Sequence, residues 1–492
     1  MKKQILLLAP MAFLALTGCQ KGGGKENQSS DQDFSGKITI NFWHTFGDKP
    51  ETALEGKVAQ FEKLVKENEG VDVDVVLSYQ GAYKDMPKKV TTGIATGDNP
   101  TIAIAYADHV ADYLDLEGND AGKYVVNLDK FLKDESLTFG TDKYLGDTMG
   151  ESDMIKSYMD EGRTLPREGT YLIPLMKSTE IMCYNLTAVK TAMQYVKPDL
   201  PVDRVKDYMK TITWDELIEI AAAAYEHKNE ISTNLEYPIY YDSDSNLFIT
   251  ELYQNNIGYS SIDSEGKGHI DFEDEPNLTK AKAIVTKLLQ ARQAHLLTTK
   301  GAEGTYASNN FKEAKTIFSI GSTGGTGYTI PDAGQFDVGF AKVPTMGGED
   351  GRVGYISQGP SVCFLNNRSL TTAENEATLK YAWKLVKYLT SKQVNVSLCV
   401  TGSEGYSPVR NSCYTTETYS DFIEDGEYYA EAALVTQNDI NGQFYNSAVF
   451  TGSATLRTEV GALITNVLKD KSPMSVDDAF TLAINNAKKD IR

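Results

Sequence analysis

The first hundred residues switch between two hydrophobic periods. Residues 37–43 (KITINFW) place an apolar side chain at every second position, as a strand does, whereas residues 54–65 repeat apolar side chains every three or four positions, as a helix does. Alternation returns at 71–79, and a third strand pattern follows the turn GDNP at 101–106. Because strand and helix patterns take turns, we expect an α/β protein with a parallel, helix-covered sheet.

The same mixture continues through the rest of the chain. Residues 213–216 (TWDE) form a capping box at the start of an apolar helix pattern. Residues 314–327 (AKTIFSIGSTGGTG) predict a strand that ends in a glycine-rich turn, and residues 336–344 (FDVGFAKVP) predict another strand. Apolar positions between 376 and 389 indicate a further helix. The sequence shows no internal repeat.

Length and charge narrow the possibilities further. The chain has 492 residues, with 48 Lys and Arg against 68 Asp and Glu, so its net charge is −20. A chain of this length is expected to divide into two domains or lobes rather than to form one core. The acidic balance argues against a nucleic-acid partner, which needs a basic face, and against electrostatic attachment to an anionic membrane.

The amino terminus has the layout of an exported lipoprotein. A lysine pair precedes a short apolar run at 5–16, which matches a secretory leader and is too short to span a bilayer. The segment LTGC at 16–19 resembles the bacterial lipobox, which predicts a signal peptide over residues 1–18 and a diacylglycerol on Cys19. Residues 19–36 have the polar, glycine-rich composition of a flexible tether. The alternative is an ordinary signal peptide with an incidental cysteine.

The sequence carries few signals for chemistry. The five histidines form no HExxH motif or other close pair, and neither GxSxG nor GxxxxGK[ST] occurs. Residues 242–246 (DSDSN) begin like a calcium loop, but Leu247 stands where that loop needs Gly. Cys399 and Cys413 are the two cysteines closest to each other in sequence, and they either form a disulfide or remain buried free thiols. We therefore expect no enzymatic activity, cofactor or metal.

Six segments follow one another along the chain in a recognisable order. They are FWHTF at 42–46, YQGAYKD at 79–85, KSTEIMCYN at 177–185, QGPSVCF at 358–364, TGSEGYSPV at 401–409 and TLRTEV at 455–460. Together with the lipobox and the tether they resemble the family 1 extracellular solute-binding proteins of ABC importers, the carbohydrate type. The resemblance is greatest to the glycerol-3-phosphate-binding branch, and it covers the chain from residue 37 onward.

The resemblance implies a type II periplasmic-binding-protein-like fold. In this fold two α/β lobes are joined by a hinge of several chain crossings and hold their ligand in the cleft between them. We expect residues 37–178 and 337–365 in the first lobe, and residues 184–335 and 367–492 in the second. The expected crossings lie near 178–184, just before 336 and near 365.

The resemblance also implies a set of ligand-binding residues. They are Tyr83, Asp108, Ser178, Ser322, Thr323, Gly359, Tyr406 and Arg457. Asp108 is one position beyond Ala107, which aligns directly with the carboxylate of the branch. The alternative for Ser322 and Thr323 is a plain tight turn.

Arg457 is the residue that would select an anion. Its planar guanidinium suits a phosphate, which it can bind through two parallel hydrogen bonds. The alternative is an exposed arginine that pairs with Glu459. Trp43 and Trp214 are expected mainly as core residues, and His44 as a structural residue.

The implied function is that of a receptor without catalytic activity. We expect a monomer on the extracellular face of the cell membrane, held there by its lipid anchor, that delivers its solute to ABC permease subunits. The favoured solute is glycerol-3-phosphate or a glycerophosphodiester, and the alternative is a neutral sugar or oligosaccharide. Alternatives of another class are a surface-anchored hydrolase and an adhesin or scaffold that binds no small ligand.

Overall fold

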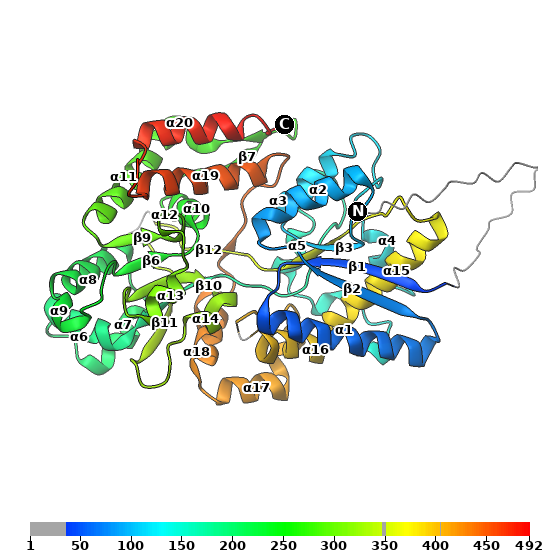
Figure 1. The fold of residues 1–492 in the computed structure, drawn as a ribbon, viewed down its shortest axis with the longest axis horizontal. Helices are drawn as coiled ribbons and strands as arrows, with labels where there is room; N and C mark the ends of the chain where they lie inside the picture. Colours follow the sequence, from blue (N-terminus) through cyan, green and yellow to red (C-terminus); the bar gives the residue numbers. More distant parts are fainter. Residues whose placement is uncertain (1–35, 347–350, 404) are drawn as a thin grey trace, which may run out of the picture.

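The computed structural model describes residues 36–346, 351–403 and 405–492, and it places them in two lobes that lie side by side (Figure 1). Each lobe is built on a five-stranded sheet with its own hydrophobic core. Within the described residues, no helix is long and apolar enough to cross a membrane. The predicted leader, Cys19 and the tether up to residue 35 lie outside the described residues.

The first lobe contains the sheet that the early hydrophobic pattern predicts, with strand order β2-β1-β3-β13-β4. β1 (Ile38–His44) runs parallel to β2 (Val73–Tyr79) and to β3 (Ile102–Ala105). β13 (Ser361–Phe364) and β4 (Ile173–Pro174) extend the sheet beyond β3. Every second residue of β1 is buried, so the alternating pattern is confirmed.

Helices cover both faces of this first sheet. α1 (Asp48–Glu69) and α15 (Thr372–Leu389) enclose the larger core with the apolar face of β1. α2 (Met86–Thr96) and α3 (Ala107–Asp115) form a smaller core on the other face, where Trp43 packs. The alternation of strand and helix periods predicts a parallel sheet between helical layers. The helical layers and the parallel strands β2, β1 and β3 are found, but β13 runs antiparallel to β3 and β4, so the sheet is mixed.

The second lobe has the strand order β11-β5-β10-β6-β9. Its strands are β11 (Val338–Lys342), β5 (Glu180–Asn185), β10 (Phe318–Ser322), β6 (Ile239–Tyr241) and β9 (Leu297–Thr299). β10, β6 and β9 are parallel, whereas β5 runs antiparallel to both of its neighbours.

Most of the longer helices belong to this second lobe. They are α6 (Leu186–Val196), α8 (Trp214–Glu226), α10 (Asp244–Gln254), α11 (Asn277–Gln293), α19 (Ser453–Leu468) and α20 (Val476–Ala487). The predicted capping box at the start of α8 is confirmed. The Thr213 hydroxyl accepts from the Glu216 amide at 3.3 Å, and the Glu216 carboxylate accepts from the Thr213 amide at 3.0 Å.

Short elements complete the two lobes. The helices among them are α4 (Asp129–Leu132), α5 (Lys156–Glu161), α7 (Val205–Met209), α9 (Lys228–Ile231), α12 (Lys300–Glu303), α13 (Ala307–Lys312), α14 (Thr326–Thr329), α16 (Lys392–Val396), α17 (Glu417–Glu424) and α18 (Tyr428–Leu434). The short strands are β7 (Ser261–Ile262), β8 (Gly268–His269), β12 (Tyr355–Ile356) and β14 (Phe444–Tyr445).

The chain passes between the lobes at three places in its described part. The first crossing, residues 177–179, pairs with the second, residues 356–360, because Ser178 and Gln358 exchange backbone hydrogen bonds of 2.8 and 3.0 Å. The third crossing, residues 425–427, links α17 to α18. Ser178 thus lies at the first crossing, as expected. The crossing expected just before 336 is wrong, and the one expected near 365 lies slightly earlier, at 356–360.

The later segments are also distributed differently from the expected lobe boundaries. β11 was expected with residues 337–365 in the first lobe, but it belongs to the second sheet because it pairs with β5. Residues 372–424 were expected in the second lobe, but they belong to the first, because α15 and Tyr419 of α17 enter its core. Apolar spacing predicts that a segment is a helix or a strand, but not which sheet it joins.

The four described cysteines, Cys183, Cys363, Cys399 and Cys413, are buried free thiols. The structure therefore contains no Cys399–Cys413 disulfide, and the alternative of free thiols is confirmed for this pair. Burial raises the pKa of the Cys399 thiol well above its usual value and that of Cys413 to about 12, so both thiols stay protonated.

Candidate functional site

The carboxyl ends of the parallel strands in the first lobe bring polar and aromatic side chains to the interface with the second lobe. β1, β2 and β3 run in one direction, so the residues that follow each strand lie at one edge of the sheet. In open α/β sheets this edge is where ligands bind. Thr45 follows β1, Tyr83 comes after β2, and Tyr106 follows β3.

Three tyrosines form a cluster at this edge, which we call the tyrosine cluster: Tyr83, Tyr106 and Tyr406. The rings of Tyr83 and Tyr106 stack with 4.7 Å between centroids and 8° between planes. Tyr406 lies near Tyr83 and meets Phe46 edge-on at 6.4 Å. Burial raises the pKa of all three phenols, that of Tyr406 to about 12, so they are neutral hydrogen-bonding groups at physiological pH.

Several hydroxyls around the cluster are buried without a well-formed hydrogen bond among the described residues. They belong to Thr45, Tyr83 and Tyr259, although the Tyr83 hydroxyl lies near those of Thr45 and Tyr406. Leaving a buried polar group unpaired costs about 1–3 kcal/mol. Three such groups at one interface indicate a place where a polar molecule binds.

Two of the predicted ligand residues form an ion pair across the lobes. Arg457 Nε of α19 donates to Asp108 Oδ2 of α3 at 2.8 Å, and the side chains are 30% and 4% exposed. Burial by itself would raise the pKa of Asp108, but the charge of Arg457, with help from His109, holds it below its usual value. The Arg457 charge is thus already compensated by Asp108. The pairing with Glu459 that sequence left open is not formed, because Glu459 accepts from Asn486.

The second lobe adds the predicted glycine-rich turn that follows β10. The exposed Ser322 accepts from the Gly324 amide at 3.2 Å, so its hydroxyl caps the turn. Thr323 is buried, and both its amide and its hydroxyl bond the backbone of Thr179 in the first crossing. A Cβ on Gly324 would lie 2.7 Å from the Tyr406 ring, so glycine is what lets this turn approach the cluster.

The predicted hinge residues adjoin the cluster. Gly359 has φ +107, and a Cβ there would lie 2.7 Å from the Ser178 amide, so this crossing requires glycine. The Gly359 backbone also hydrogen-bonds the Tyr106 hydroxyl. Ser178 is buried, and its backbone is engaged by Gln358. Gly359 therefore joins the hinge directly to the cluster.

The structure brings Tyr83, Asp108, Tyr406, Gly359 and Arg457 together, whereas Ser322 and Thr323 reach the site only through the turn and the hinge. Tyr106, Thr45 and Tyr259 were missed. Tyr106 ends the third predicted strand and precedes Asp108 by two residues, so its position was a usable signal. Tyr259 comes from an irregular segment after α10 that carries no motif.

The remaining aromatic and metal candidates lie elsewhere. Trp43 and Trp214 pack in the cores of the first and second lobes, as expected. His269, Glu273 and Asp274 are close enough to share a metal ion, but Lys488 already pairs with Glu273 at 2.5 Å. The calcium-like stretch is used structurally, since Asp244 at the start of α10 accepts from the Thr299 hydroxyl and the Gly301 amide.

Solved structures share this architecture at low sequence identity. UgpB from Mycobacterium tuberculosis in complex with glycerophosphocholine is 16% identical, with 92% of this chain and 98% of that chain covered and a TM-score of 0.65. The GacH receptor of Streptomyces glaucescens, solved unliganded and with acarbose, is 19% identical, with coverage of 92% and 97% and a TM-score of 0.62. The cyclic α-maltosyl-1,6-maltose binding protein from Arthrobacter globiformis is 16% identical, with coverage of 92% and 99% and a TM-score of 0.61. These likenesses confirm the type II periplasmic-binding-protein-like fold.

Sequence comparison assigns the family. No curated protein gives a significant match to this chain. The family model described as bacterial extracellular solute-binding protein matches residues 58–428, which is more than half of the chain. The chain therefore belongs to the bacterial extracellular solute-binding proteins.

Proposed function

We propose that this protein is the receptor of an ABC importer and captures a neutral, polyhydroxylated solute of the sugar class between its lobes. The buried hydroxyls around the tyrosine cluster carry the proposal. Those of Thr45, Tyr83 and Tyr259 make no well-formed hydrogen bond among the described residues, and a sugar can both donate to and accept from such groups. The stacked rings of Tyr83 and Tyr106 add an aromatic surface, which suits the apolar face of a sugar ring.

The charge of the site favours a neutral solute. Arg457 is paired with Asp108 at 2.8 Å, so the two side chains together contribute no net charge. A phosphate would have to compete with the Asp108 carboxylate for the guanidinium. A neutral sugar instead needs hydroxyl and backbone partners, which the cluster and Gly359 supply.

The second candidate solute is glycerol-3-phosphate or a glycerophosphodiester, and a specific observation favours it. Arg457 uses Nε toward Asp108 and is 30% exposed, so the Nη groups of its guanidinium could bind a phosphate. The tyrosine hydroxyls would then bind the glycerol part. The predicted glycerol-3-phosphate branch therefore remains a proposal of second rank.

A binding panel separates the two candidates. Calorimetry and thermal unfolding are followed with maltose, maltotriose and glycerol-3-phosphate, on the wild type, on Tyr83→Ala and on the charge-free pair Asp108→Asn with Arg457→Gln. For a neutral sugar we expect at least tenfold weaker binding to Tyr83→Ala and little change in the charge-free pair. Stabilisation by glycerol-3-phosphate alone, lost in the charge-free pair, would reverse the order of the candidates.

We further propose that Cys19 carries the lipid that holds the receptor at the extracellular face of the cell membrane, where it meets the permease as a monomer. The LTGC segment at 16–19 and the polar stretch behind it support this proposal. Two or more acyl chains are enough for stable anchoring. Cys19→Ala should move the protein from the membrane fraction to the soluble fraction, with its solute affinity unchanged.

A further inference from the structure

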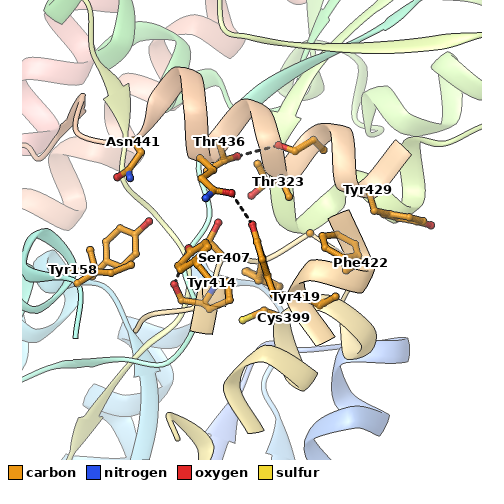
Figure 2. A pocket seen from close by; sticks show the side chains of 18 of the residues that line it. Tyr158, Thr323, Cys399, Ser407, Tyr414, Tyr419, Phe422, Tyr429, Thr436 and Asn441 are labelled. Carbon is orange, nitrogen blue, oxygen red and sulfur yellow. Dashed lines mark hydrogen bonds between the residues drawn. The ribbon is translucent and has the colours of Figure 1, made fainter. Parts of the chain in front are cut away.

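A cavity of about 300 Å³ lies between the lobes (Figure 2). Tyr406 is one of its described lining residues, whereas Tyr83 and Tyr106 are not. The first lobe lines it with residues of α5, α17 and the loop that carries Tyr406, and the second lobe with Thr323 and residues of α18 and of the turn that follows it. The third crossing, residues 425–427, links α17 to α18 beside it. The cavity is therefore lined by both lobes and lies beside the third crossing of the hinge.

The lining of this cavity is neutral. None of its described lining residues is an Asp, Glu, Lys or Arg, although such residues make up 24% of the chain. Burial raises the pKa of the phenols of Tyr158 and Tyr414, and that of Tyr419 to about 12, so these groups carry no charge at physiological pH. An ion inside the cavity would lose its hydration without gaining a counter-charge.

Aromatic rings form much of the wall, and amides lie toward solvent. The rings are those of Tyr158, Tyr406, Tyr414, Tyr419, Phe422 and Tyr429. Asn411, Gln437 and Asn441 also line the cavity, and all three are exposed, so they stand at its mouth. The Tyr419 hydroxyl donates to Gln437 at 3.2 Å, which links α17 of the first lobe to the second lobe. In Figure 2 this bond is the dashed line that meets the hydroxyl of Tyr419.

Rings inside and amides at the mouth suit one kind of molecule. A sugar ring places its C–H faces on aromatic side chains and its hydroxyls on amides. Ligand pockets range from about 300 to 1,000 Å³, so this cavity is of a size for a single ring. We propose that it is a second binding site, separate from the tyrosine cluster, for one neutral monosaccharide ring.

Because the cavity lies between the lobes, a molecule bound in it should affect how the lobes are arranged. A molecule that contacts both α17 and α18 binds best when the lobes are together, so it favours the closed arrangement. Tyr406 belongs to both sites, because it lines the cavity and also lies beside Tyr83. We therefore expect a sugar in the cavity to tighten binding at the tyrosine cluster, and the reverse by the same factor.

The test uses the whole chain and three neutral probes, D-glucose, D-galactose and D-mannose, with thermal unfolding and calorimetry as readouts. Ala433→Phe fills the cavity from the second lobe, and Ala373→Phe is the matched control at an exposed position of α15. We expect at least one probe to stabilise the wild type, Ala373→Phe and Tyr83→Ala, and to bind Ala433→Phe at least tenfold more weakly. Equal binding to Ala433→Phe, or no stabilisation by any probe, would overturn the proposal.

Two further measurements keep the result clear. If Ala433→Phe does not fold, Gln437→Leu at the exposed mouth serves instead, with an expected loss of about fivefold. Crystals soaked in the stabilising sugar should show it in the cavity, and an empty cavity would overturn the proposal. Binding lost in Tyr83→Ala but kept in Ala433→Phe would mean that only the tyrosine cluster binds sugar. The opposite pattern is the expected one and bears on the cavity alone, because the function of the cluster is tested separately with maltose and maltotriose.

Discussion

Two of the edges along which the lobes touch differ in chemistry. At the first, which we call the α3 edge, α3 lies beside α19 (Figure 1). Three acids at positions 108, 112 and 115 lie on one face of α3, because residues three and four apart share a helix face. Each acid meets a partner from the second lobe: Asp108 meets Arg457, Asp112 the Gly452 amide, and Asp115 the Arg492 side chain, at 2.8, 2.9 and 2.9 Å.

The second edge, which we call the α1 edge, is much sparser. The Tyr328 hydroxyl donates to Asp48 at the start of α1 at 2.9 Å, and both side chains are exposed. Exposed polar contacts of this kind contribute little, because water competes for both partners. The α3 edge includes the Asp108 carboxylate, which is 4% exposed, so loss of its ion pair with Arg457 should lower the stability of the protein markedly. We conclude that, of these two edges, the α3 edge holds the lobes more strongly, and that the lobes can separate at the α1 edge at low cost.

The largest effect is expected from breaking the buried pair of the α3 edge. Arg457→Met leaves the Asp108 carboxylate buried without its counter-charge. Removing one partner of a fully buried pair costs about 3–5 kcal/mol, and because Arg457 is 30% exposed we expect about 2–3 kcal/mol here. Urea unfolding measures the change. The matched control is Arg492→Met at the exposed end of the edge, whose side chain is 72% exposed, where we expect less than about 0.5 kcal/mol.

Equal losses in both arginine variants would contradict the importance that we give to burial at this edge. The pH dependence offers a further check. The pKa of Asp108 is lowered in the folded protein, so the stability it contributes is present above its unfolded pKa and is lost only as pH falls through the lower folded value. In Arg457→Met burial instead raises the pKa of Asp108, so the difference from the wild type should persist at neutral pH and begin to shrink in mild acid, as the carboxyl group of the variant takes up a proton.

The sequence predicts which segments form helices and strands better than it predicts which sheet or lobe each segment joins. The alternating apolar pattern of residues 37–43 and the capping box at 213–216 each depend only on residues close together in sequence, and both are confirmed. β11 and α15 were placed in the wrong lobes, because a strand pattern is the same whichever sheet it joins. Strand pairing depends on contacts between distant parts of the chain that no local pattern records.

The candidate site shows the same division. Tyr83 and Tyr406 were predicted from short motifs, and the structure brings them together although more than 300 residues separate them. The pairing of Asp108 with Arg457 was not foreseen, because each was considered alone as a partner for the solute. Tyr259 could not be predicted, since only the folded chain carries it to the neighbourhood of that pair.

An intermediate effect is expected at the middle of the α3 edge. Burial above all, with repulsion from Asp108 and Asp115, raises the pKa of Asp112 from 3.8 to about 6. The folded protein therefore binds this proton more tightly than the unfolded chain, and stability is fully present below pH 3.8 and falls as pH rises through about 6. Asp112→Asn removes the charge and keeps an oxygen for the Gly452 amide. It should be more stable than the wild type by about 1–2 kcal/mol at pH 7.5.

Thermal unfolding of Asp112→Asn across the pH range checks this expectation. The gain over the wild type should vanish near pH 4, where Asp112 is protonated. A control variant, Asp115→Asn, removes the more exposed acid of the same face, for which we expect no gain, because Asp115 pairs with Arg492. A gain in Asp112→Asn that does not change with pH would show that the charge of Asp112 is not its cause.

The smallest effect is expected at the α1 edge, and it sharpens the contrast. Tyr328→Phe removes the hydrogen bond to Asp48 but keeps the ring, so we expect a loss of less than about 0.5 kcal/mol by urea unfolding. Tyr306→Phe is the matched control, because that tyrosine is similarly exposed and lies within the second lobe. The bond from Tyr328 to Asp48 joins the two lobes, whereas Tyr306 lies within one lobe. Only Tyr328→Phe should therefore increase the radius of gyration of the solute-free protein in X-ray scattering. A loss as large as that of Arg457→Met would mean that both edges hold the lobes equally, and the lobes could not then separate preferentially at the α1 edge.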